Sequence, residues 1–282
     1  MADTKLIVVP TPIGNLSDIT DRVREALLSA DLIACEDTRT TGRLLKHLGA
    51  KAPTISYHMH NEKARCADIL EALDQGRTVA LVSDAGMPGV SDPGQVVIEA
   101  AIGHGVEVVV LPGPSAFVTA LVGSGLPTDR FTFVGFLEKN RTRRKKQLEE
   151  VKDRPDTLIF YEAPHRLREF LETLREVLGD RRVSLARELT KLHEEYERGT
   201  LSELIERYET KEPRGEYVII AEGRTPEEAR AEAEASLEGL SIEDHVRQLM
   251  EEGLSKMDAV KRVAKERGLK KNEVYMKVTE ID

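Results

Sequence analysis

VSDAGMPGVSDPG at residues 82–94 and LPGPSA at residues 111–116 are turn-forming segments, and each follows a buried, β-rich apolar run. The two runs are TVALVS (78–83) and VEVVVL (106–111). Continuous apolar runs of this length are typical of strands in a parallel sheet covered on both faces. Ligands of such sheets bind beyond the carboxyl ends of the strands, and glycine lets the backbone approach them closely. The two segments therefore predict an α/β protein with a small-molecule site.

Strand-like and helix-like segments alternate through the first part of the chain, which predicts right-handed crossovers and a layered parallel sheet. We expect an N-terminal α/β domain at 1–123 and a C-terminal α/β domain at 124–223, with the boundary around Gly123–Asp129. The second domain opens with RFTFVGF (130–136), and its sheet is predicted to be mixed. Residues 224–282 are predicted to form a polar connector and three short helices. These helices resemble a helix-turn-helix module, and a dimerisation or capping tail is the alternative.

Composition and charge exclude several classes of protein. The formal net charge of -9 argues against a protein that coats nucleic acid, although the basic stretch KNRTRRKK (139–146) could contact RNA locally. No apolar run is long enough to cross a bilayer, and the first residues lack the pattern of a secretory signal, so we expect a cytoplasmic protein without a membrane partner. Cys35 and Cys66 belong to no Cys/His ligand pattern, and we expect neither a disulfide nor a metal site. GxGxxG and P-loop motifs are also absent from the sequence.

Charged and polar residues recur where predicted strands end. They occur in EDTR (36–39), YHMHN (57–61), FYEAPHR (160–166) and RELTKLHEE (187–195), as well as in the segment at 84–92. One such strand end is typical of helix capping, whereas five together indicate a shared polar cleft. A charged, glycine-rich cleft without a metal or phosphate motif favours group transfer from a bound donor.

These motifs together resemble the tetrapyrrole methylase superfamily. Nine motifs occur between residues 11 and 218 in the order found in one bacterial branch, the cytidine 2′-O-methyltransferases of small-subunit ribosomal RNA. They are TPIGNL, EDTR, YHxHN, VSDAGxPxxSDPG, LPGPSA, FxGFL, FYExPHR, RELTKxHEE and GEYV. The resemblance implies two α/β domains with a cofactor cleft between them, S-adenosylmethionine as the methyl donor and a homodimer. It also implies a small-subunit ribosomal RNA substrate within the assembled subunit. Met87, Gly89 and Glu138 depart from the pattern of that branch.

The resemblance also assigns site residues to this chain. Glu36, Asp37, His60 and Lys191 are the candidates for a general base, and the sequence does not choose between them. The residues expected to contact RNA are Arg39, Asn61, Arg143, Arg144, His165 and Arg166. The residues expected to bind the cofactor are Pro12, Asp84, Ala85, Gly86, Pro112, Gly113, Ser115, Ala116, Tyr161, Ala163, Pro164 and Leu189.

Other functions remain open at the level of sequence. A methylase of porphyrinoid or corrinoid rings would use the same scaffold, and its carboxylate-rich substrate would also favour arginines. A non-catalytic RNA- or ribosome-binding factor would use the helical tail, and a diphthine-type protein methylase is a weaker option. Methyl transfer from a bound cofactor separates the enzymes from the binding factor.

Overall fold

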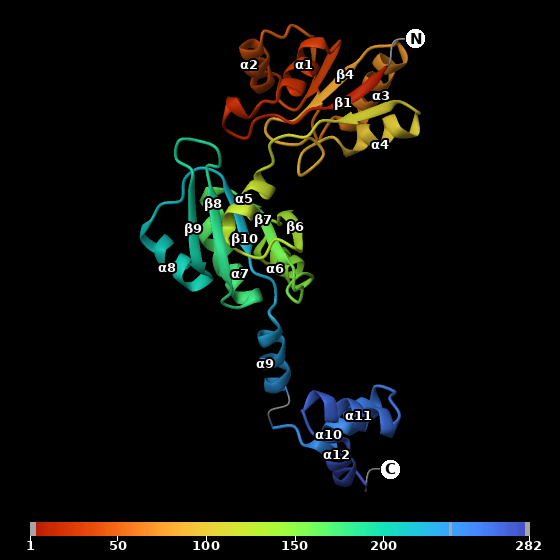
Figure 1. Cartoon of the computed structure of the whole chain (residues 1–282), viewed down its shortest axis with the longest axis vertical. Helices are drawn as coiled ribbons and strands as arrows, with labels where there is room; N and C mark the ends of the chain where they lie inside the picture. Colours follow the sequence, from red (N-terminus) through yellow and green to blue (C-terminus); the bar gives the residue numbers. More distant parts are fainter. Residues whose placement is uncertain (1–3, 237–238, 280–282) are drawn as a thin grey trace. The chain divides into compact units, whose positions relative to one another are not determined.

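The computed structural model describes residues 4–236 and 239–279, and they form two compact units, Met1–Gly223 and Arg224–Asp282. The first unit contains two five-stranded sheets, each with its own helices (Figure 1). The predicted α/β class is therefore confirmed.

The first sheet is fully parallel, as the alternating pattern predicts, with strand order β3-β2-β4-β1-β5. Successive residues of a strand point to opposite faces. Leu6 therefore packs with α3 and α4, whereas Ile7 packs with α1 and α2. Both faces are covered, which explains the continuous apolar runs. The elements are β1 (Lys5–Val8), η1 (Leu16–Asp18), α1 (Asp21–Ser29), β2 (Leu32–Cys35), α2 (Thr38–Leu48), β3 (Thr54–Ser56), α3 (Glu62–Asp74), β4 (Val79–Val82), α4 (Gln95–Gly103) and β5 (Glu107–Val110).

The second sheet is mixed, as predicted, with order β6-β7-β10-β8-β9. β6 and β7 are parallel, and the other pairs are antiparallel. Helices α6, α7 and α8 contribute to the core on one face, and α5 packs on the other. The elements are α5 (Ala116–Ser124), β6 (Phe131–Phe136), α6 (Arg141–Glu149), β7 (Thr157–Glu162), η2 (Pro164–Arg166), α7 (Leu167–Leu178), β8 (Arg182–Arg187), β9 (Glu195–Thr200), α8 (Leu201–Thr210) and β10 (Tyr217–Ala221).

Helix α5 lies just before the predicted domain boundary in the sequence, but its side chains pack on the second sheet. The sequence assigns it to the N-terminal domain, but Ala120 and Leu121 pack with Ile159 and Val218 of the second sheet. The side chains of the helix thus complete the second layer, although its N-terminus follows a strand of the first. The division of residues 1–223 into two domains stays a prediction, with α5 in the second layer.

The second unit contains α9 (Pro226–Ser236), α10 (Ile242–Glu251), α11 (Lys256–Glu266) and α12 (Lys271–Lys277). The last three share a small apolar core that includes Val246, Val260 and Val274. The Ser255 side chain accepts a hydrogen bond from the Asp258 backbone N–H and so caps the N-terminus of α11. None of the helices within 4–236 and 239–279 is long and apolar enough to span a bilayer.

Candidate functional site

The loops that follow β1 and β4 are tied together by backbone bonds. Thr11 and Gly86 form a two-way antiparallel bridge, with N–O distances of 2.9 and 3.0 Å. The hydroxyl of Thr11 donates to the Ser83 carbonyl at 3.0 Å, and the Ser83 hydroxyl donates to the Gly86 carbonyl at 3.2 Å. Gly86 has a φ of 81°, a left-handed conformation that glycine adopts without strain. These bonds fix the glycine-rich turn at the edge of the parallel sheet.

The LPGPSA segment joins the same group of loops. A Cβ atom at Gly113 would lie 2.4 Å from Cγ of Pro10, so only glycine allows this approach. Ser115 then precedes α5 as its N-cap residue. Segments 9–14, 83–94 and 111–115 thus lie together at the carboxyl ends of the strands, where ligands of parallel sheets bind.

A cavity of about 380 Å³ opens beside these loops, which is within the range of small-molecule sites. Loop residues form one side, and strands β7, β8 and β10 and their flanking residues form the other. An aromatic wall, defined here as Phe117, Phe136 and Tyr161, contributes to the lining. The rings of Phe136 and Tyr161 lie 5.3 Å apart, and Phe136 is 59% exposed. The lining is therefore largely apolar and suits a planar group.

The charged residues that line this cavity are all acidic: Asp92, Glu162 and Glu216. Glu162 is buried, and its Oε1 accepts hydrogen bonds from the Ala163 N–H (2.7 Å) and from Arg166 Nε (2.8 Å). The second oxygen of Glu162 is buried without a hydrogen-bond partner in the part of the chain that the structure describes. The charged part of the cavity lining is thus acidic, which suits a ligand that carries positive charge.

Seven of the twelve residues expected to bind a cofactor line this cavity. They are Ala85, Ser115, Ala116, Tyr161, Ala163, Pro164 and Leu189. Pro12 and Asp84 instead line a second, smaller cavity next to α2, together with Thr41 and His47. Gly86, Pro112 and Gly113 line neither cavity, and they shape the loops. The structure therefore brings most of the predicted set together.

The candidate bases lie in different electrostatic environments. Burial and then the charge of Asp84 raise the pKa of Glu36. Hydrogen bonds from Arg39 lower the pKa of Asp37 to about 2, which makes this carboxylate a weak base. Its side chain also caps α2. His60 is exposed in the turn after β3.

Lys191 is unsuited to the role of base. Burial lowers its pKa, but hydrogen bonds to Glu216 and Glu188, both at 3.0 Å, outweigh that effect and raise it. A lysine held protonated by two carboxylates cannot accept a proton. Instead, Lys191 packs against the loop that follows β1. A Cβ at Gly14 of this loop would lie 2.5 Å from Cγ of Lys191. The ion pairs of Lys191 hold the segment that carries Leu189 into the cavity wall.

The residues expected to contact RNA also separate into two groups. The expectation for Arg144 is wrong, because its side chain is 0% exposed and pairs with Glu169 at 2.5 Å. The guanidinium of Arg166 is similarly committed to Glu162, and only 14% of its side chain is exposed. Asn61 uses its amide within the turn after β3, where it accepts from the His58 N–H at 2.8 Å and donates to the Ser56 carbonyl at 3.1 Å. These three residues stabilise the fold.

Arg39, Arg143 and His165 are exposed and stay candidates for RNA contact. Arg39 is 87% exposed, although its guanidinium also pairs with Asp37. Within the basic stretch, Arg141 and Lys145 both pair with Glu176, which reduces the local positive charge.

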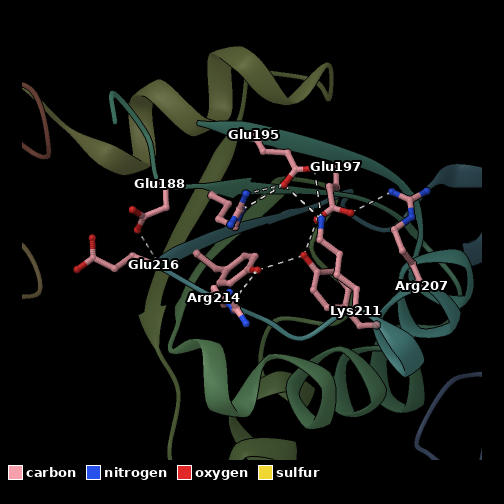
Figure 2. A network of polar contacts seen from close by, with 10 residues as sticks. Glu188, Glu195, Glu197, Arg207, Lys211, Arg214 and Glu216 are labelled. Atoms are coloured by element: carbon pink, nitrogen blue, oxygen red, sulfur yellow. Dashed lines mark hydrogen bonds and ion pairs between the residues drawn. The ribbon is translucent and has the colours of Figure 1, made fainter. Parts of the chain in front are cut away.

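A polar network extends from the cavity into the second sheet. The hydroxyl of Tyr217, which lines the cavity, bonds to Tyr208 at 3.2 Å, and Tyr208 donates to the buried carboxylate of Glu197. Glu197 also accepts from Arg207 at 3.2 Å and from Lys211 at 2.9 Å (Figure 2). A buried carboxylate is stable only when it is paired in this way. The network therefore fixes the position of Tyr217 on β10.

Sequence reasoning missed several of the lining residues. Phe117, Phe136, Tyr217 and Val218 look like ordinary core residues in the sequence, because their orientation toward a cavity depends on tertiary packing. Asp92 was visible as part of the polar segment at 84–92, but it was not selected as a candidate.

The fold and the cavity together define an α/β protein with a cavity of small-molecule size beyond the carboxyl ends of a parallel sheet. More particularly, the chain belongs to the family described as Tetrapyrrole (Corrin/Porphyrin) Methylases, whose sequence profile matches residues 5–205. The family expected from the motifs is therefore confirmed.

Curated relatives give a more specific comparison. A Halalkalibacterium halodurans protein named Ribosomal RNA small subunit methyltransferase I is 45% identical over 270 residues, which cover 96% of this chain and 93% of that protein. A Thermotoga maritima protein of the same name is 46% identical over 220 residues, which cover 78% of this chain and 99% of that protein. Among solved structures, a diphthine synthase has a TM-score of 0.62 with 16% identity, covering 78% of this chain and 90% of that one, and it supports the fold alone.

Proposed function

We propose that this chain transfers a methyl group from S-adenosylmethionine to small-subunit ribosomal RNA. Two curated relatives that match most of its length carry a name with that activity. The observation that carries the proposal is the cavity, whose charged lining residues are all carboxylates. S-adenosylmethionine carries a sulfonium and an ammonium group, and both attract carboxylates.

The chain has groups that fit each part of this cofactor. The aromatic wall suits stacking with adenine. Pro112 and Gly113 are exposed, so backbone groups of segment 111–115 can hydrogen-bond a ligand. When bound, the cofactor supplies a methyl group that is already activated by its positive sulfur.

The finer specificity that we propose is the 2′-oxygen of a cytidine ribose within the assembled small subunit. The protein then has two tasks: it aligns the acceptor oxygen with the methyl group, and it excludes water. Such positioning can lower a barrier by roughly 7–11 kcal/mol. An RNA substrate also places the proposed reaction in the cytoplasm.

We assign RNA binding to exposed basic residues on the surface of the first unit. Arg39, Arg143 and His165 are proposed to contact phosphates, which position RNA without reading its sequence. A ring methylase for porphyrinoids and a non-catalytic binding factor are both less favoured, because the curated relatives share an rRNA methyltransferase name.

A homodimer is the assembly that we propose. Val118 and Val122 lie four residues apart on α5, so they share a face of this helix. The two residues are 44% and 72% exposed, so this face of α5 presents apolar surface to solvent. A second copy of this chain could cover them.

The deciding experiment follows tritium from labelled S-adenosylmethionine into purified small subunits or naked RNA, with nucleoside mapping of the product. The proposal expects label on a cytidine 2′-oxygen and more label in assembled subunits. Labelled ribosomal protein with unlabelled RNA would overturn it.

A further inference from the structure

Asp92 lies in the loop between β4 and α4, and the backbone of this loop is closed on itself. The Gly89 N–H donates to the Pro93 carbonyl at 3.3 Å, and a Cβ at Gly94 would lie 2.8 Å from the backbone nitrogen of Gly89. These contacts hold residues 89–94 as a narrow turn, with Asp92 near its tip. Both Ser91 and Asp92 line the cavity.

Ser91 adopts a strained conformation immediately before Asp92. Its φ of 64° is in the left-handed region, which a non-glycine residue adopts only at a cost of about 1–3 kcal/mol. A Cβ at Gly135 of β6 would lie 3.3 Å from the Ser91 hydroxyl, so the second sheet packs tightly against this residue. Because strain of this kind clusters at active sites, the orientation of Asp92 is a candidate for function.

Asp92 is a carboxylate without a cationic partner. It has no hydrogen bond or ion pair with any residue in 4–236 or 239–279. The charged groups that influence it are Glu36 after β2 and Asp84 after β4, and both are acidic. Tyr161 of β7 is also close enough for its pKa to be affected by the charge of Asp92. The neighbours of Asp92 therefore favour uptake of a proton.

From this placement we infer that Asp92 accepts the proton of the RNA hydroxyl during methyl transfer, which makes it a catalytic residue of the proposed reaction. This role rests on the proposed function. The ribose oxygen forms a bond to the methyl carbon, and the carbon–sulfur bond breaks with its electron pair moving to sulfur. The hydroxyl proton moves to the Asp92 carboxylate, so the products are a methyl ether, a neutral thioether and a protonated aspartic acid.

Asp92 meets the requirements better than the four candidates from the sequence. Burial, followed by the charges of Glu36 and Asp84, raises its pKa to about 6. Such a group is mostly ionised at neutral pH, yet it is a much stronger base than a carboxyl with a pKa of about 2, the value of Asp37. Asp92 lines the cavity of about 380 Å³, whereas none of the four other candidates does: Glu36, Asp37, His60 and Lys191.

The test compares the full-length wild type with Asp92→Asn and with Glu99→Gln, a control at an exposed carboxylate of α4. Single-turnover methyl transfer to small subunits is measured from pH 5 to 8.5, and S-adenosylmethionine affinity is measured by calorimetry. Asp92→Asn should slow transfer by about 10²- to 10⁴-fold, and the rise in rate near pH 6 should disappear. Cofactor affinity should fall by less than tenfold, because Glu162 and Glu216 still line the cavity. Glu99→Gln should behave as the wild type does.

Each other outcome has a definite meaning. Equal rates, or the same rise near pH 6 in Asp92→Asn, would overturn the role of Asp92 while leaving the proposed function intact. A loss of cofactor affinity as large as the loss of rate would show a binding role instead. Failure of the wild type to label RNA would overturn the proposed function itself. If Asp92→Asn fails to fold, the wild-type profile alone decides, because a rate that is flat between pH 5 and 7 contradicts the inference.

Discussion

Arg143 and Arg144 are adjacent on α6, but they have opposite environments. Arg143 is exposed, whereas Arg144 is fully buried, pairs with Glu169 and lies 6.0 Å from the centre of the Phe170 ring. The sequence could predict a basic helix here, but it could not show which arginine points inward, because the apolar pattern of this stretch is weak. Burial of an arginine depends on partners that other elements supply.

The two arginines should therefore respond differently to substitution. Arg144→Ala should destabilise the protein by about 2 kcal/mol, because it removes a buried ion pair and aliphatic packing, although Glu169 can then be hydrated. Arg143→Ala should leave stability unchanged and weaken RNA binding, with a smaller dependence of affinity on salt. Urea unfolding and RNA titrations at several salt concentrations measure the two effects. A stable Arg144→Ala protein would contradict the structural role.

Asp92 predicts a pH dependence of stability whose sign follows from its pKa. The folded-state pKa of about 6 is above the usual value of 3.8, so burial penalises the charged form. Stabilisation by the neutral form is complete below about pH 3.8 and is lost as pH rises through about 6. Asp92→Asn should thus be more stable than the wild type at pH 8, by about 1–2 kcal/mol, and equally stable near pH 4.

Melting temperatures without ligand at pH 8 and pH 4 check this prediction. The variant should melt a few degrees higher at pH 8 only. An equal or lower melting temperature at pH 8 would show that the carboxylate has a stabilising partner.

At the scale of elements, the sequence predicted the strands of the parallel sheet and the helices between them. Most of those strands are apolar runs, and glycines end several helices; Gly49, for example, has a φ of 76° after α2. Strand β9 (Glu195–Thr200) was missed, because its sequence EYERGT is mostly polar and continues the polar segment 187–195. It lies at the edge of the second sheet, where charged residues are common because they oppose unwanted pairing.

The loop between β4 and α4 gives a prediction at the same scale. Gly94→Ala should lower S-adenosylmethionine affinity by at least tenfold, because a Cβ at 2.8 Å from Gly89 must open the turn that carries Ser91 and Asp92. Gly103→Ala is the matched control, since Gly103 ends α4 and a Cβ there would meet nothing within 4 Å. Calorimetry measures both variants. Equal affinities would mean that the shape of this turn is unimportant for the cofactor.

At the scale of the whole molecule, the large cavity depends on two layers that are separate in sequence. The motifs predicted which loops take part, because they follow strands of one parallel sheet. The expected cofactor-binding set also included four residues of the second wall: Tyr161, Ala163, Pro164 and Leu189. Phe136 and Tyr217 could not be predicted, since their orientation depends on how the mixed sheet packs in the first unit. The Thermotoga maritima relative matches over 99% of its own length with only 78% of this chain, so part of this chain has no counterpart there.

The most direct measurement is calorimetric titration of the full-length protein with S-adenosylmethionine, beside the variant Ala163→Trp. Ala163 lines the cavity, and an indole at this position would fill much of the space near Glu162 and Tyr161. We predict saturable binding by the wild type and at least a hundredfold loss in the variant, with a melting temperature that shows an intact fold. No binding by the wild type, or equal binding by the folded variant, would contradict a cofactor site in this cavity.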